Sequence, residues 1–258
     1  MEHLVIAAVA ALASLLTFFS GFGLGTLLLP AFALFLPLAD AVAATAVVHG
    51  ANNVLKVSLM GRHADRRVLL VFGLPAVICA WLGASLLGRL AADAPLASYR
   101  LAGHEAVVTP VGLALGGLMI VFGLLEMASA ARRSGLSRRW LPLGGALSGF
   151  FGGLSGHQGA LRSAFLASTR IEPAEFVGTN AVLGLAVDAV RLTVYLGALQ
   201  AAGSAWRPGP LVLTGCAAAF LGAVIGKRLL GKTTMGGVRR LTFAMLLAMG
   251  ALLASGLI

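Results

Sequence analysis

Apolar runs of nearly bilayer length follow one another along almost the whole chain. Glycine, proline and charged residues separate them into runs near 3–20, 23–38, 41–60, 68–90, 107–128, 141–155, 157–168, 176–199, 209–226 and 238–257. Runs approaching about 20 apolar residues are long enough to cross a bilayer as helices. The pattern therefore predicts membrane segments in two series of five. The first two segments of each series are short and rich in glycine, so we interpret them as broken or re-entrant helices.

The composition supports an integral membrane protein. Hydrophobic residues make up 59% of the 258 residues and charged residues 11%, with a mean hydropathy of +0.96, whereas soluble domains carry roughly 25% charged residues. The net charge is +10 and the pI about 11.2. The basic residues occupy short loops between apolar runs and not one polar face, which argues against nucleic acid as a partner and for a lipid bilayer.

The two halves of the chain resemble each other. "GFGLGTLLLPAF" (21–32) aligns with "GLSGHQGALRSAF" (153–165), and "WLGASLLGRL" (81–90) aligns with "FLGAVIGKRL" (220–229). We expect two repeats, residues 1–128 and 141–258, joined by a basic connector at 129–140. Because each repeat has an odd number of segments, the second is upside down relative to the first. The predicted fold class is an all-α integral membrane protein of two inverted repeats.

The loop charges orient this arrangement. With five segments per repeat, most basic residues fall on one side of the membrane, which the positive-inside rule places in the cytoplasm. Both termini are then outside. The basic residues on the cytoplasmic side are Arg62, Arg66, Arg67, Arg132, Arg133, Arg138, Arg139, Arg170, Lys227, Arg228, Lys232, Arg239 and Arg240, against Arg89, Arg100 and Arg207 on the other.

The glycine-rich stretches occupy corresponding places in the two halves. Gly23 and Gly25 lie in the first, and Gly156 and Gly159 in the second. A broken membrane helix exposes backbone groups that protein, water or a ligand must satisfy, and each freed helix N-terminus carries partial positive charge. Paired breaks in inverted halves indicate an anion site near the bilayer midplane. The alternative, that the glycines only allow close helix packing, stays open.

Polar side chains recur at helical spacing in two of the apolar runs. Residues 176–199 and 41–60 each carry a polar stripe whose members are three or four positions apart, and further polar residues lie at the second break. Stripes from corresponding segments are expected to face a shared cavity. The residues expected to bind substrate are Arg162, Arg191, Asn180, Gln158, His157, Asn52, Thr45 and Lys56, together with Gly23, Gly25, Gly156 and Gly159.

The charges within these runs are unbalanced. Asp188 and Arg191 are spaced to form an ion pair, either structural or functional. Arg162 and Lys56 have no acid in their own segments, and excess buried positive charge favours an anionic ligand. Asp188 and His49 are candidates for proton coupling or for an ion pair, and a histidine hydrogen-bonded within the bundle is the alternative.

Other functional classes find little support in the residues. There is no metal-ligand motif, nucleophile with its base, or pair of acids at usable spacing, so we expect no enzyme, no metal and no cofactor. An anion channel lined by Arg and Lys remains an alternative. A membrane subunit without transport activity and an intramembrane enzyme are the others.

The glycine-rich opening of each half, the run that ends at Pro30, and the "LGA" helix followed by a basic residue resemble the TauE/SafE family, also called DUF81 or the 4-toluene sulfonate uptake permeases. The resemblance covers essentially the whole chain, and "GHQGALRSAFL" followed by "VDAVRLTVY" is similar to a distinct branch. It implies secondary transport of small sulfur anions such as sulfite or organosulfonates across the bacterial inner membrane, with export as the expected direction. A homodimer is compatible with it. The chain departs from a symmetric pattern where the first half has Pro30 and the second has Arg162 and Ser163.

Overall fold

The computed structural model describes residues 1–20, 23–101, 103–129, 137–169, 171–201, 209–228 and 236–257. In this part of the chain each predicted segment contains one α-helix. The helices are α1 (Glu2–Ser20), α2 (Leu24–Ala33), α3 (Leu38–Met60), α4 (Arg66–Ala92), α5 (Pro110–Ser129), α6 (Leu141–Ser155), α7 (Gly159–Leu166), α8 (Pro173–Ala201), α9 (Pro210–Arg228) and α10 (Gly236–Ser255). Most of the predicted connector 129–140, with Arg132 and Arg133, and also Arg170, Arg207 and Lys232, lie outside the described residues.

Two segment boundaries differ from the prediction. Helix α2 ends at Ala33, not near residue 38, because Pro37 is the N-cap of α3 and its fixed φ and missing N–H suit the start of a new helix. The apolar residues near 107 belong to a strand. Strands β1 (Ala97–Leu101) and β2 (His104–Val108) form an antiparallel hairpin before α5 begins at Pro110.

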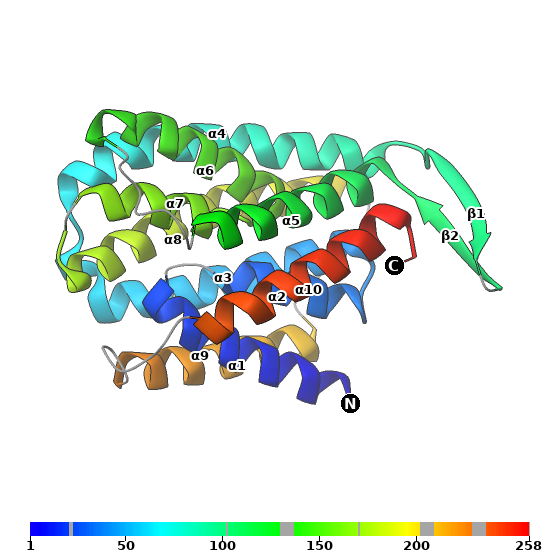
Figure 1. Cartoon of the computed structure of the whole chain (residues 1–258), viewed down its shortest axis with the longest axis horizontal. Coiled ribbons are helices and arrows are strands. Elements are labelled where there is room, and N and C mark those ends of the chain that lie inside the picture. Colours follow the sequence, from blue (N-terminus) through cyan, green and yellow to red (C-terminus); the bar gives the residue numbers. More distant parts are fainter. Residues whose placement is uncertain are drawn as a thin grey trace.

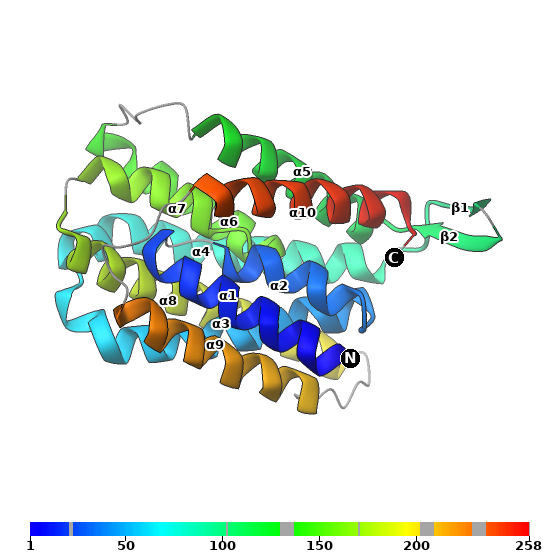
Figure 2. The same ribbon diagram turned by 60° about the horizontal axis from the view of Figure 1, so that its bottom comes forward.

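The helices lie side by side in an elongated bundle, and the hairpin projects from one end of it (Figure 1). Both termini lie toward that same end (Figures 1 and 2). The hairpin is fastened to the C-terminal end of α10, because Tyr99 donates to the carbonyl of Ser255 over 2.7 Å and the Val107 N–H donates to the carbonyl of Gly256 over 2.9 Å. Tertiary contact therefore converts this apolar stretch into a strand.

The opposite end of the bundle collects basic residues. The α3–α4 connection, the start of α6 and the end of α9 all lie there (Figure 1). Asp65 caps α4 by accepting from the N–H groups of Arg67 and Val68. The described basic residues of these connections are Arg62, Arg66, Arg67, Arg138, Arg139, Lys227 and Arg228.

Three helices are long and apolar enough to cross a membrane by length and composition: Arg66–Ala91, Pro173–Ala198 and Pro210–Arg228. The outer face of α4 exposes large apolar side chains at spacings of three and four, namely Leu70, Leu74, Ile78 and Trp81. A soluble protein does not leave such a continuous apolar stripe in water. The chain is therefore a multi-pass membrane protein whose outer helix faces contact lipid.

Close backbone contact joins α4 to α6. A Cβ atom on Gly145, Gly149 or Gly153 would collide with a main-chain carbonyl oxygen of α4. The carbonyls belong to Phe72, Ala76 and Ala80, one helical turn apart. Small residues at a spacing of four allow membrane helices to approach in this way. These glycines of α6 serve packing, in contrast to the glycines at the helix breaks.

This packing predicts a stability defect without a change at the breaks. Replacing Gly149 with Val is expected to destabilise the protein by about 1–3 kcal/mol or more, because the side chain meets backbone that cannot rotate away. Thermal unfolding of the detergent-solubilised protein measures this effect. Gly117→Val is the matched control, since a Cβ there has no atom within 4 Å. Equal unfolding temperatures for the two variants would contradict the packing argument.

The remaining helix pairs form a regular set. Helix α1 packs on α9, α4 on α6, α3 on α8 and α5 on α10. The short helices α2 and α7 each pack beside a long polar-striped helix, α2 on α3 and α7 on α8. The α3–α8 pair thus brings both polar stripes into the interior, next to the two helix breaks.

Candidate functional site

Two interruptions of the helical path face each other inside the bundle. Gly23, with φ of 119°, precedes α2, and Gly156, with φ of 80°, follows α6. Such positive φ values suit glycine because it lacks a Cβ. A Cβ on Gly25 would lie 3.2 Å from the carbonyl oxygen of Gly156. Breaks that are about 130 residues apart in the chain, roughly one predicted repeat, therefore meet in space.

A small pocket lies between these breaks. It holds about 340 Å³ of empty space, counting its open mouth, and is lined by Gly23, Gly25, Thr26, His49, Phe122, Gly156, His157, Gly159 and Ala160. The lining comes from both helix N-termini and from α3 and α5.

The N-terminal amides of α2 and α7 belong to this lining. In α2 the first N–H bonded back along the helix is that of Leu27, which donates to Gly23, and in α7 it is that of Arg162, which donates to Gln158, both over 3.0 Å. The amides before them have no intrahelical acceptor. Two positive helix ends at one pocket form a favourable environment for an anion.

Two buried polar atoms of the pocket residues lack a hydrogen-bond partner within the described part of the chain. They are Oγ1 of Thr26 and Nε2 of His157. A buried polar group left unsatisfied costs about 1–3 kcal/mol. The other ring nitrogen of His157 lies 3.0 Å from Oγ of Ser155, and the ring stacks on Phe122 with centroids 5.8 Å apart. The unsatisfied atoms indicate that the pocket accommodates a polar guest.

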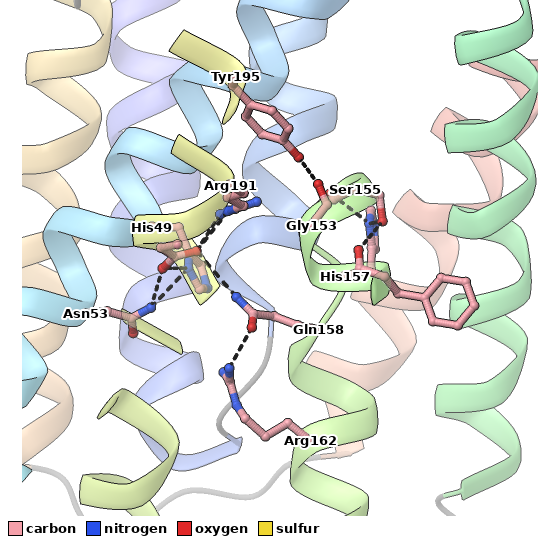
Figure 3. A network of polar contacts seen from close by, with 11 residues as sticks. His49, Asn53, Gly153, Ser155, His157, Gln158, Arg162, Arg191 and Tyr195 are labelled. Atoms are coloured by element: carbon pink, nitrogen blue, oxygen red, sulfur yellow. Dashed lines mark hydrogen bonds and ion pairs between the residues drawn. The ribbon is translucent and has the colours of Figure 1, made fainter. Parts of the chain in front are cut away.

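Asp188 is the centre of a hydrogen-bonded network behind the pocket (Figure 3). Its Oδ1 accepts from Nε of Arg191 at 2.9 Å and from Nε2 of Gln158 at 3.3 Å, and Nη2 of Arg191 lies 2.8 Å away. Its Oδ2 accepts from Nδ1 of His49 at 2.6 Å and from Nδ2 of Asn53 at 2.7 Å. Because an ionised carboxylate only accepts, Nδ1 of His49 carries the hydrogen of that bond.

Gln158 connects this network to the second buried arginine. Its Oε1 accepts from Nη1 of Arg162 at 2.9 Å, while Nε of Arg162 donates to Oδ1 of Asn180 at 2.5 Å. Arg162, Gln158 and Arg191 therefore lie in one polar column beside the break (Figure 3). A Cβ on Gly156 would collide with Nη1 of Arg191. The Arg191 guanidinium thus lies directly behind the break glycine.

The structure divides the residues that the sequence analysis selected into three groups. Gly23, Gly25, Gly156, Gly159, His49 and His157 line the pocket. Arg162, Arg191, Asn180, Gln158 and Asp188 form the network behind it. Asn52, Thr45 and Lys56 lie elsewhere on α3: Asn52 accepts from Ser14 of α1, Lys56 lies over the Phe18 ring of α1, and Oγ1 of Thr45 has no partner within the described residues.

The buried charges of the described residues do not balance. They are Lys56, Arg162, Arg191 and Asp188, three cations and one anion at their ordinary charges. Within the described chain the ion pairs of Asp188 are with His49 and Arg191. Charged side chains inside a membrane need partners. The interior therefore carries a positive potential that attracts an anion.

Sequence reasoning missed two side chains of the pocket. Thr26 carried a usable signal, because it directly follows Gly25 at the first break. Phe122 carried none, since it is one apolar residue among many in α5 and only helix packing brings it to the pocket. Asn53, which bonds Asp188, lies beside the predicted stripe of α3.

Comparison with known proteins adds one match. The family described as Sulfite exporter TauE/SafE matches residues 6–253. That range contains both helix breaks and every residue of the pocket. No curated protein matches the chain.

Proposed function

Because the chain belongs to the TauE/SafE sulfite exporter family, a family of transporters, we propose that the pocket between α2 and α7 binds a small anion and carries it across the bacterial inner membrane. Sulfite or an organosulfonate is the proposed substrate class, and export the proposed direction. The observation that carries this proposal is the meeting of two helix N-termini at one pocket with unsatisfied polar atoms. Amide N–H groups and the Thr26 hydroxyl donate to the anion's oxygens.

The buried cations act at two levels in this proposal. Arg191, directly behind Gly156, supplies positive potential to the pocket, with Asp188 holding its guanidinium in place. Arg162 donates to the neutral amides of Gln158 and Asn180, so its charge stays available to attract an anion. Lys56 on α3 adds to the same field. Asn52 and Thr45 remain proposed neutral ligands in states where α3 has moved.

Alternating access is the proposed mechanism, with helices α1–α5 and α6–α10 as inverted repeats. Exchanging the two sets converts the α1–α9 pair into the α6–α4 pair and leaves the α3–α8 and α5–α10 pairs unchanged. This exchange supports a pseudo-two-fold relation between residues 1–128 and 141–258. Rocking of one repeat against the other around the pocket would expose it first to one side and then to the other.

We propose that the basic end of the bundle faces the cytoplasm. The basic residues of the described connections gather there, and the positive-inside rule favours that side. Both termini and the β1–β2 hairpin then lie outside.

Reconstitution of the full chain into liposomes tests the proposal. We expect labelled sulfite uptake that saturates and that accelerates when unlabelled sulfite is loaded inside, because a carrier returns faster when it is occupied. Liposomes without protein are the control. Flux without such counterflow would indicate an anion channel. Absence of any anion movement would exclude transport and favour a membrane subunit.

A further inference from the structure

His49 differs from the other pocket side chains in its direct bond to a buried carboxylate. Its Nδ1 donates to Oδ2 of Asp188 over 2.6 Å, and its Cδ2 lies 3.6 Å from the position of a Cβ on Gly25. The ring thus has one edge on Asp188 and the opposite edge toward the pocket. Within the described residues, Nε2 of His49 makes no hydrogen bond.

Asp188 is held in its ionised form by the donors around it. Arg191 and Gln158 donate to Oδ1, and His49 and Asn53 donate to Oδ2. A protonated carboxyl would place a hydrogen against one of these donors. The imidazole therefore keeps its hydrogen on Nδ1, and a second proton enters the pair at Nε2.

The charged groups around His49 leave its own charge to the pocket's occupant. Helix α8 contributes Asp188 and Arg191, whose charges offset each other. Helix α7 contributes Arg162 through Gln158, the break contributes His157, and α3 carries Lys56 two turns away. Helices α2 and α5 contribute pocket residues without titratable side chains: Gly25, Thr26 and Phe122.

We propose that His49 takes up one proton at Nε2 as the anion binds, so that anion and proton cross the membrane together. The inference rests on the proposed function, since it concerns the same pocket. An uncharged His49 presents a lone pair to the anion, which repels it, whereas the imidazolium presents an N–H donor and a positive charge. The proton comes from water with the arriving anion and returns to water when the anion leaves.

His157 is the natural comparison because it lines the same pocket. Oγ of Ser155 donates to the carbonyl of Phe151 over 3.0 Å, so it accepts from Nδ1 of His157. These partners are neutral, and no carboxylate is bonded to this ring within the described residues. His157 therefore lacks the acidic partner that stabilises an imidazolium, and it stays uncharged through the cycle.

Two isosteres of His49 separate its two edges. His49→Asn retains an amide at the position of Nδ1, which bonds Asp188, and shortens the pocket edge. His49→Gln places its amide N–H at the position of Nε2, where it imitates the protonated ring. Sulfite affinity of the full chain in detergent, followed by calorimetry from about pH 6 to about pH 9, is the measurement. Bulk protonation of sulfite is the same for every variant and cancels in the comparison.

We expect the affinity of the wild-type protein to fall with rising pH by up to about tenfold per unit more than that of His49→Gln. His49→Asn should bind at least tenfold more weakly than His49→Gln, and His157→Gln should keep the wild-type pH dependence. An identical pH dependence in wild type and His49→Gln, or loss of binding in His49→Gln, overturns the inference. Absence of sulfite binding by the wild-type protein at every pH overturns the proposed function instead.

Discussion

Replacing Asp188 with Asn is expected to abolish anion transport and to destabilise the folded protein by about 3–5 kcal/mol. The substitution removes the negative charge that offsets Arg191 and places amide hydrogens among groups that already donate, namely His49, Asn53 and Gln158. Breaking a buried ion pair from one side leaves an uncompensated charge, which is the costly case. The lost bond to His49 also frees the ring that lines the pocket.

Thermal unfolding and liposome flux of the same preparation measure the two effects. Asp93→Asn is the matched control, because Asp93 is exposed at the end of α4 and should behave as wild type. The double variant Asp188→Asn with Arg191→Gln should recover part of the stability, since no cation is then left unpaired. Wild-type stability of Asp188→Asn alone would show that Asp188 is not the centre of the network.

Replacing Gly25 with Val is expected to eliminate sulfite binding while the protein still folds. The new Cβ would lie 3.2 Å from the Gly156 carbonyl and 3.6 Å from Cδ2 of His49, so the γ-methyl groups extend into the pocket. Gly25 lies in the first turn of α2 with an ordinary helical backbone, so the fold tolerates a side chain better there than at Gly156. Loss of at least 100-fold in affinity, about 2.7 kcal/mol, is the expected size.

Calorimetric titration with sulfite measures this loss, and gel filtration with thermal unfolding verifies the fold. Gly25→Ala should give an intermediate affinity, because one methyl group fills less of the space. Gly117→Val again serves as control, since its surroundings are open. If Gly25→Val binds sulfite as tightly as the wild-type protein does, the anion site is not the pocket between α2 and α7.

The glycines of this protein have two distinct roles that the sequence alone does not separate. Gly145, Gly149 and Gly153 allow α6 to contact α4, whereas Gly156 turns the chain between α6 and α7. Gly153 and Gly156 are only three positions apart. Their roles differ because one faces a neighbouring helix and the other adopts a positive φ, and both properties depend on the surrounding structure.

The sequence by itself determined the number and order of the helices, because an apolar run of bilayer length and its glycine or charged boundaries are local features. It also identified the polar stripes of α3 and α8, since a helical period of 3.6 places residues three and four apart on one side. His49, Asp188 and Arg191 were found in this way, and all three are buried.

Only the tertiary structure decided which of these polar residues meet. The rotation and pairing of whole helices turn Lys56 and Asn52 toward α1, bring Phe122 to the pocket, and put the Arg191 guanidinium behind Gly156. The strand at 104–108 was decided in the same way, by its bonds to β1 and to Gly256. Such contacts join residues far apart in the chain, and local periodicity carries no information about the partner that each face will find.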